Sequence, residues 1–280
     1  MTNLTPYEQA QADKILSWKQ ETPGIVEQAI GFALSPISSM LTKVVPPTVI
    51  ESLLRASDWL AEKTVAPRAE AITSAAGTDL APLPGLETFD EEAEKVRKWA
   101  IALAGGEGAL AGAFGLFSLP VDIPAVITLS LRTIRRVGLC YGYSGTSEEE
   151  KRFVLGVLSV AGANSMKQKV AALTTLRNLE IALITQAGNV LAAKAAERAV
   201  SGETALLFVR DVAEQLGVNL TKRRALAAIP IIGAAVGGAM NAWYLRDIGQ
   251  SAQRAYQERW LRDRGHIIDH VETPPASSAA

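Results

Sequence analysis

The apolar residues of this chain recur every three or four positions over long stretches, which is the spacing of one face of an α-helix. Val170, Leu173 and Leu176 show this spacing within a helical pattern that extends from about 165 to 200 and is interrupted near Gly188. No stretch alternates apolar and polar residues between turn signals, as successive β-strands would. The pattern therefore predicts an all-α fold.

Hydroxyl residues followed by acidic residues predict several helix starts, because the hydroxyl accepts a free backbone N–H and the acids favour the positive helix end. The residues in question are Thr5, Thr48, Thr88 and Ser147. The first of them opens a capping box, Thr5-Pro6-Tyr7-Glu8, with proline at the first helical position. We expect that helix to extend to about Gln20.

The distribution of glycine and proline suggests how the chain is divided. The segment 77–87 is rich in both and is typical of a linker loop. It separates an N-terminal helical region, 1–76, from a main helical domain over 88–265. The tail 272–280 has the composition of a disordered terminus. We expect one compact multi-helix bundle in which the N-terminal region packs on the main domain.

Two apolar, glycine-rich segments stand out, 99–131 and 225–245. The second is uncharged and long enough to cross a bilayer, but Pro230, its glycines and Asn241 lower its hydrophobicity. We favour a core helix surrounded by neighbours, which can be apolar on every side. A re-entrant or interfacial membrane segment is the main alternative, and a true span is a further one.

Small-residue spacing within these segments predicts close helix packing. Gly233 and Gly237 form a GxxxG pair, and Gly108 and Gly112 repeat it in the first segment. Such pairs let another backbone approach, so we expect the two segments to form a central helix pair. Asn241 needs a hydrogen-bond partner if it is buried, and the region of Asp122 is a candidate.

Composition narrows the class of protein. The net charge is −1 and the isoelectric point is near 6.2, which argues against a nucleic-acid-binding protein. A single cysteine, Cys140, precludes an internal disulfide framework and suits a reducing compartment. The N-terminus lacks the basic start and apolar core of a signal peptide. We therefore expect a cytoplasmic protein, or one on the inner face of the cytoplasmic membrane.

Two blocks of residues resemble those of the EcsC family. The first is the run 119–125 (LPVDIPA), followed by Leu131-Arg132 and Tyr141-Gly142-Tyr143. The second is the run 228–238 (AIPIIGAAVGG), followed by Asn241 and Arg259-Trp260-Leu261. The resemblance extends from about Thr88 to Leu261. It implies a bacterial, helical protein whose partner is a membrane lipid or a membrane protein such as a transporter subunit, because the family's namesake is encoded beside an ABC transporter.

The first block offers a candidate anion site. Asp122 suits an N-cap with Pro124 in the first turn, which predicts a helix over 123–140. Arg132 and Arg136 would share one face of that helix and could hold a lipid phosphate. For the motif alone we favour the simpler interpretation, in which the cap and ion pairs fix the bundle.

A compact basic cluster, Lys222-Arg223-Arg224, directly precedes the second apolar segment. A solvated turn is the simpler interpretation of such a cluster. Contact with anionic lipid head groups is the alternative, and the neighbouring apolar segment makes it more attractive, since each charge near such a surface contributes about 1 kcal/mol.

Catalytic signatures are weak throughout. The loose GxGxxA run over 106–111 lacks the strands of a dinucleotide site, and 142–146 lacks the last glycine of a nucleophile elbow. His266 and His270, with Asp269 between them, resemble an inverted zinc-protease motif, but a solvated helix end is the better interpretation. We predict no catalytic residue and no cofactor.

The sequence thus predicts a non-enzymatic, peripherally membrane-associated protein that binds lipid or a membrane partner. Its anion contacts would come from Arg132, Arg136 and the basic cluster 222–224. One alternative is a hydrolase acting on a hydrophobic substrate, with Asp122 and Arg132 at its centre. Another is a soluble scaffold that pairs helices with a partner protein.

Overall fold

A computed structural model describes residues 4–23, 85–114, 119–144, 147–163, 165–188, 212 and 230–266. Every element with described bounds is a helix, which confirms the predicted all-α class for this part of the chain. The helices are α1 (Pro6–Gln20), α4 (Leu86–Phe114), α5 (Leu119–Cys140), α6 (Glu148–Ala161), α7 (Met166–Gly188) and α10 (Pro230–Asp263). The boundaries at 76 and 272 that the sequence suggests lie outside the described residues, whereas Leu86 and Glu87, the last two residues of the expected linker 77–87, belong to α4.

Two of the predicted helix starts are confirmed. Glu8 N–H donates to Thr5 Oγ1 at 3.2 Å, and Thr5 N–H donates to Glu8 Oε2 at 2.7 Å, which completes the capping box of α1. Ser147 Oγ accepts from Glu150 N–H at 3.2 Å at the start of α6. Both signals are local, so they need no tertiary contact to act.

Two other predicted starts are wrong by a few residues. α4 begins at Leu86, so Thr88 lies in its first turn instead of capping it. α5 begins at Leu119, so Asp122 is a helical residue and not an N-cap. Pro120 explains the second difference, because a proline fits the first turn of a helix, where its missing N–H would have no partner. Thr48 lies outside the described residues.

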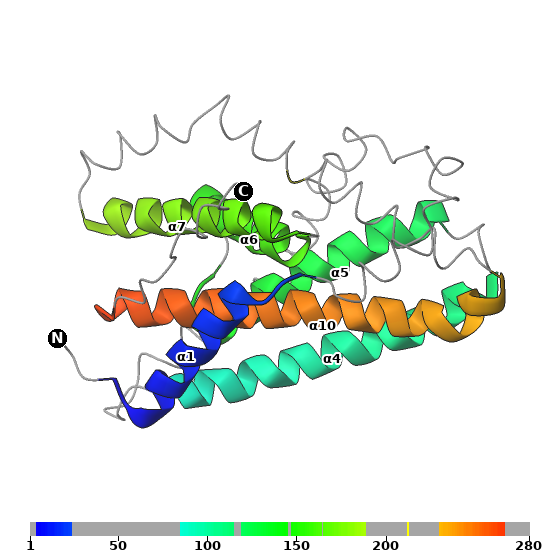
Figure 1. The fold of residues 1–280 in the computed structure, drawn as a ribbon, viewed down its shortest axis with the longest axis horizontal. Coiled ribbons are helices and arrows are strands. Elements are labelled where there is room, and N and C mark those ends of the chain that lie inside the picture. Colours follow the sequence, from blue (N-terminus) through cyan, green and yellow to red (C-terminus); the bar gives the residue numbers. More distant parts are fainter. Residues whose placement is uncertain are drawn as a thin grey trace, which may run out of the picture.

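The bundle is organised around α10 and α4, which lie side by side, run antiparallel and form the most extensive helix pairing of the described part (Figure 1). These helices contain the GxxxG pairs, so the predicted pairing of the two glycine-rich segments is confirmed at the level of helices. α5 packs on both, α6 pairs with α7, and α1 lies against α10, α4 and α7. None of the described helices is both long and apolar enough to cross a membrane.

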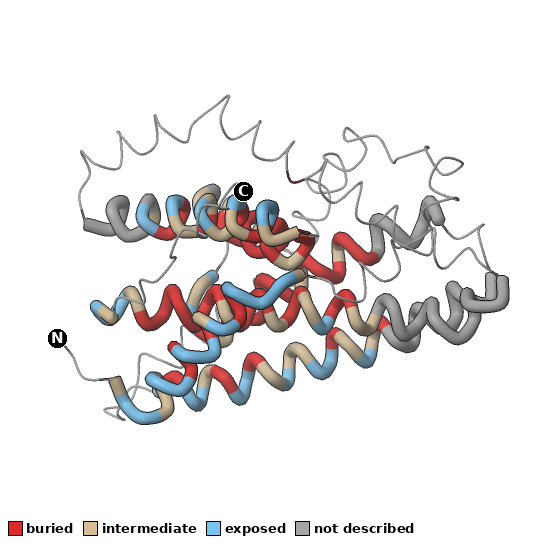
Figure 2. Tube along the Cα trace, in the orientation of Figure 1, coloured by how far each residue is buried: buried red, intermediate tan, exposed pale blue. Residues whose placement is uncertain are grey.

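The C-terminal half of α10 is the centre of the bundle. Residues 251–261 are all buried except the half-buried Arg254, and Figure 2 shows this continuous stretch beside the mixed exposure of α4. A helix is buried on successive positions only when neighbours cover it on every side. The buried set includes polar residues, Gln253, Gln257, Glu258 and Arg259, which must find partners inside the protein.

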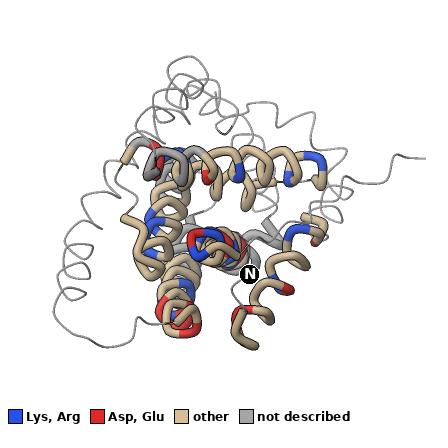
Figure 3. Tube along the Cα trace, turned by 90° about the vertical axis from the view of Figure 1, so that its left-hand side faces the viewer, with Lys and Arg blue, Asp and Glu red and all other residues tan. Residues whose placement is uncertain are grey.

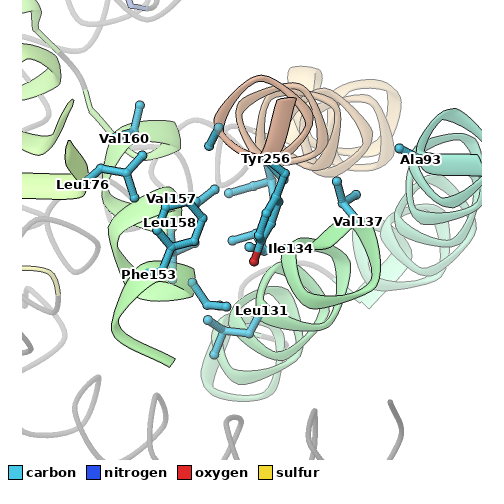
Figure 4. Close-up of a cluster of buried hydrophobic side chains, with 14 of the residues drawn as sticks. Ala93, Leu131, Ile134, Val137, Phe153, Val157, Leu158, Val160, Leu176 and Tyr256 are labelled. Atoms are coloured by element: carbon cyan, nitrogen blue, oxygen red, sulfur yellow. The ribbon is translucent and has the colours of Figure 1, made fainter. Parts of the chain in front are cut away.

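Tyr256 occupies the middle of the apolar core, between residues of α5 and α6 (Figure 4). Its ring centroid lies 5.1 Å from that of Phe153. On the other side it touches Gly138, where an added Cβ would lie 2.6 Å from Tyr256 Cζ. Glycine at 138 is therefore what allows α5 and α10 to pack with a tyrosine between them.

Candidate functional site

The two arginines predicted to bind an anion share an aromatic partner. Arg132 and Arg136, one helical turn apart on α5, both lie over the ring of Trp99 on α4. Their Cζ atoms are 5.3 Å and 4.6 Å from the ring centroid. Trp99 is 39% exposed and is one of two large apolar side chains exposed among the described residues, with Ile181. Trp99, Arg132 and Arg136 together form the Trp99 patch.

The two arginines of the patch differ in the partners that they have within the protein. Arg132 makes no ion pair with any carboxylate of the described residues, and its buried Nε has no hydrogen-bond acceptor there. Arg136 has further interactions within the fold. A guanidinium over an indole face gains roughly 0.5–2 kcal/mol from the ring quadrupole, yet its N–H edge remains able to donate to an anion. The patch therefore combines an exposed indole with a guanidinium that pairs with no carboxylate of the described residues.

A second arrangement joins the two sequence blocks that carried the family resemblance. Arg259 pairs with Glu150 through two hydrogen bonds of 2.5 Å and 3.0 Å, and its Cζ lies 3.9 Å from the ring centroid of Tyr143. The hydroxyl of Tyr143 donates to Asp263 at 2.7 Å, and burial, followed by that carboxylate, raises its pKa. Residues from 141–143 and 259–261 thus meet in one cluster.

Backbone geometry at the end of α5 makes this meeting possible. Gly142 has a φ of +88°, Tyr143 N–H donates to Gly138 O, and Gly142 N–H donates to Leu139 O. This is a Schellman C-cap, in which glycine adopts the left-handed conformation at low cost. The cap turns Tyr143 back toward α10, so Gly142 serves a structural role.

Asp90 is a buried hub that sequence reasoning missed. Its side chain accepts from Tyr7 at 2.8 Å, from Tyr141 at 2.5 Å and from Gln257 at 2.7 Å, and Asp90 is only 6% exposed. Burial is the main cause that raises the pKa of both tyrosines, and Asp90 raises it further. These contacts hold α1, α4, the end of α5 and α10 together. In the sequence Asp90 looked only like a first-turn acid.

The EcsC protein family matches the chain over residues 9–261. The chain belongs to the EcsC family. The match begins well before about Thr88, the N-terminal limit of the resemblance seen in the sequence. A curated relative, "Uncharacterized protein YdbA" of Bacillus subtilis (strain 168), is 27% identical over 184 residues. That alignment covers 66% of this chain and 61% of the relative, so the chain spans about three fifths of the length of the relative it matches. No solved structure matches.

A cluster of buried charges in this EcsC-family chain links α1, α7 and α10. Lys19 Nζ lies 2.5 Å from Glu258 Oε1, and Arg262 donates to both Glu258 and Glu180. Figure 3, which looks along the bundle, shows basic and acidic positions close together on the central helix, α10. Burial is the main cause that lowers the pKa of Lys19, and the attraction of Glu258 opposes it. A cavity borders this cluster.

Several motif residues of the EcsC-family chain are described only as backbone. Asp122 and Pro124 are part of α5. Pro230, Gly233, Gly237 and Asn241 are part of the first half of α10. The structure does not describe the side chains of Asn241 and Asp122, so the contact suggested between Asn241 and the Asp122 region stays a prediction. The basic cluster Lys222-Arg223-Arg224 lies outside the described residues altogether.

Of the two weak metal-ligand candidates, His266 and His270, the structure describes only His266. α10 ends at Asp263, Gly265 has a φ of +80°, and His266 N–H donates back to Leu261 O. His266 therefore follows the C-cap of α10 and does not lie on that helix. His270 lies beyond the described residues. Within the described ranges, no group of three His, Cys, Asp or Glu side chains is placed to hold a metal ion.

Proposed function

We propose that this EcsC-family protein is a non-enzymatic, peripherally membrane-associated protein, and that the Trp99 patch contacts anionic lipid head groups. The observation that carries the proposal is the stacking of Arg132 and Arg136 on the half-exposed indole of Trp99. Tryptophan is the residue most typical of the boundary between head groups and acyl chains, and arginine is well suited to bind phosphate.

The balance of energies favours a reversible contact. Each basic residue near an anionic membrane contributes about 1 kcal/mol, so two arginines alone give weak binding. Trp99 adds apolar area, and the cluster 222–224 supplies further basic residues in the same chain. The resulting attraction is mainly electrostatic and is screened over about 10 Å at ordinary salt concentrations. Such a protein binds the surface of a membrane without inserting.

The buried polar residues support a structural role for the centre of the bundle. Asp90 accepts hydrogen bonds from residues on three other segments, and Glu150 is paired with Arg259. These groups connect helices, and their partners are protein side chains. In the Trp99 patch the indole is exposed and both arginines are only half-buried, so the proposal places recognition there and not in the core.

Vesicle binding tests the proposal. The full chain is sedimented with vesicles of phosphatidylcholine, alone or mixed with phosphatidylglycerol, and compared with the double variant Arg132→Glu, Arg136→Glu. We expect wild-type protein to bind only the anionic vesicles, and the double variant to bind them at least tenfold more weakly, because reversal removes two favourable charges and adds repulsion.

A matched control separates the patch from net charge. Lys14 on α1 and Lys167 on α7 are exposed, and the double variant Lys14→Glu, Lys167→Glu changes the net charge by the same amount. We expect this control to retain most of the binding. Equal loss in the two double variants would contradict a role for the Trp99 patch, as would equal binding of wild-type protein to neutral vesicles.

A further inference from the structure

The charged cluster on α1, α7 and α10 borders a cavity of about 130 Å³. Its lining divides into two parts. One part is charged and includes Lys19, Arg177 and Arg262 with Glu180 and Glu258. The other part is apolar and includes Leu173 and Leu176 on α7. A cavity of about 150 Å³ accommodates a ligand the size of benzene, so this one suits roughly six non-hydrogen atoms.

Among the described lining residues, the charged part contains three cationic and two anionic side chains. Lys19 is 9% exposed, and Glu258 is its acceptor among the described residues, at 2.5 Å. An ammonium group carries three N–H donors, so Lys19 retains donors for a further acceptor. Burial lowers its pKa despite the nearby Glu258, and Arg262 and Arg177 lower it further. The remaining donors of Lys19 are therefore available to an anion that enters the cavity.

The cluster is also held in place before any ligand arrives. Arg262 bridges Glu258 and Glu180, which fixes both carboxylates, and Glu258 in turn fixes Lys19. Leu176 is positioned by Gly156 on α6, where an added Cβ would lie 2.9 Å from Leu176 Cδ1. Preorganised donors beside an apolar wall lose little conformational freedom on binding.

We propose that this cavity binds a short-chain monocarboxylate, with its carboxylate toward Lys19 and Arg177 and its alkyl end against Leu173 and Leu176. A carboxylate accepts hydrogen bonds from both kinds of donor, and charge-assisted bonds of this type are the strong ones. The alkyl end matches the apolar wall, which a fully hydrated inorganic anion would leave unfilled. The Trp99 patch is on α4 and α5, so this site is independent of the proposed lipid contact.

The test uses sodium butyrate as the probe and the uncharged butyramide as its control, with the full wild-type chain. Ligand-observed NMR and titration calorimetry are expected to show saturable binding of butyrate and at least tenfold weaker binding of butyramide. Absence of saturable butyrate binding, or equal binding of the two compounds, would overturn the proposal. Equal affinity for butyrate and inorganic phosphate would overturn the assignment to monocarboxylates. These comparisons need no variant.

Variants then locate the site. Arg177→Gln removes one cation and leaves the pairs of Lys19 and Arg262 in place, so we expect butyrate to bind at least tenfold more weakly. Lys167→Gln, on the exposed side of the same helix, is the matched control and is expected to leave affinity unchanged. Unchanged affinity in folded Arg177→Gln protein would place butyrate elsewhere and overturn the assignment of this cavity.

Discussion

The guanidinium of Arg259 lies over the ring of Tyr143, 3.9 Å from its centroid, while it pairs with Glu150 on α6. The two stacked residues come from sequence blocks more than a hundred positions apart. Their contact brings the end of α5 against the C-terminal half of α10, which is buried over almost every position from 251 to 261. The two blocks that carry the resemblance to the family therefore meet at a helix junction.

Breaking that junction should be costly. In Arg259→Met the carboxylate of Glu150, whose side chain is 12% exposed, loses both of its hydrogen bonds from Arg259. We expect the free energy of unfolding to fall by about 3–5 kcal/mol, as when one partner of a buried ion pair is removed. Denaturant unfolding measures this. The double variant Arg259→Met, Glu150→Gln should lose less than Arg259→Met alone, and additive losses would contradict a direct pair.

Gly138→Ala tests the close packing at Tyr256. The added Cβ would lie 2.6 Å from Tyr256 Cζ, so either the helix or the ring must shift. We expect a loss of about 1–3 kcal/mol, typical of overpacking in a core, measured by chemical denaturation. Gly85→Ala is the control, because nothing lies within 4 Å of its Cβ position. Similar losses at both positions would indicate a general effect of alanine and contradict the packing argument.

The hydroxyl of Tyr256 leads to the opposite prediction. It is buried and has no hydrogen-bond partner among the described residues. Removing an unsatisfied buried polar group is neutral or stabilising, so Tyr256→Phe should leave the free energy of unfolding unchanged or raise it by up to about 1 kcal/mol. A clear loss in thermal or denaturant unfolding would show that the hydroxyl has a partner.

The Asp90 hub should show graded effects. Asp90→Ala leaves Tyr7, Tyr141 and Gln257 without their shared acceptor, and we expect a loss of about 2–4 kcal/mol. Tyr7 is half-buried, so in Tyr7→Phe the loss should be nearer about 1 kcal/mol. Denaturant unfolding of both variants measures these losses in the free energy of unfolding. A loss in Tyr7→Phe as large as that in Asp90→Ala would contradict the prediction.

Lys169 predicts a pH dependence of stability. It is 5% exposed and donates to the backbone carbonyls of Trp18 and Glu21 at the end of α1, and burial lowers its pKa to about 8. The unfolded chain keeps this proton until about pH 10.4, so above roughly pH 8 unfolding takes up a proton. The contribution of Lys169 to stability therefore rises with pH.

Comparing the free energy of unfolding of wild-type protein and Lys169→Met at each pH isolates the contribution of Lys169. The tyrosines titrate alike in both proteins, so their contributions cancel. The free energy of unfolding of wild-type protein, relative to the variant, should increase by about 2 kcal/mol between roughly pH 7 and 9.5. Denaturant unfolding at several pH values measures it. Parallel pH profiles would show that Lys169 keeps an ordinary pKa in the folded protein.

The sequence predicted features that depend on neighbouring residues. The caps at Thr5 and Ser147 were correct because a hydroxyl and an acid three residues on decide them locally. The start of α5 was misplaced because Pro120 is compatible with both a loop and a first helical turn. The central pair of helices was predicted from the glycine content of two segments. Glycine allows another helix to approach closely, whichever part of the sequence that helix comes from.

The contacts that the sequence did not reveal depend on tertiary packing. Asp90 meets Tyr7 and Gln257 across 83 and 167 positions. The C-terminal half of α10 is polar in sequence yet buried, because its neighbours satisfy its side chains. In the sequence Trp99 is one of many apolar residues, and its contact with two arginines depends on the packing of α5 against α4. No local pattern encodes which arginines stack on it.

Membrane association is tested by fractionation of cells that express the full chain, followed by a salt wash and then a detergent wash of the membranes. We expect the protein to pellet with membranes and to be released by salt, because screening weakens contacts between arginines and anionic lipid. Protein that stays in the soluble fraction before any wash would contradict membrane association. Release by detergent but not by salt would contradict a peripheral, electrostatic contact.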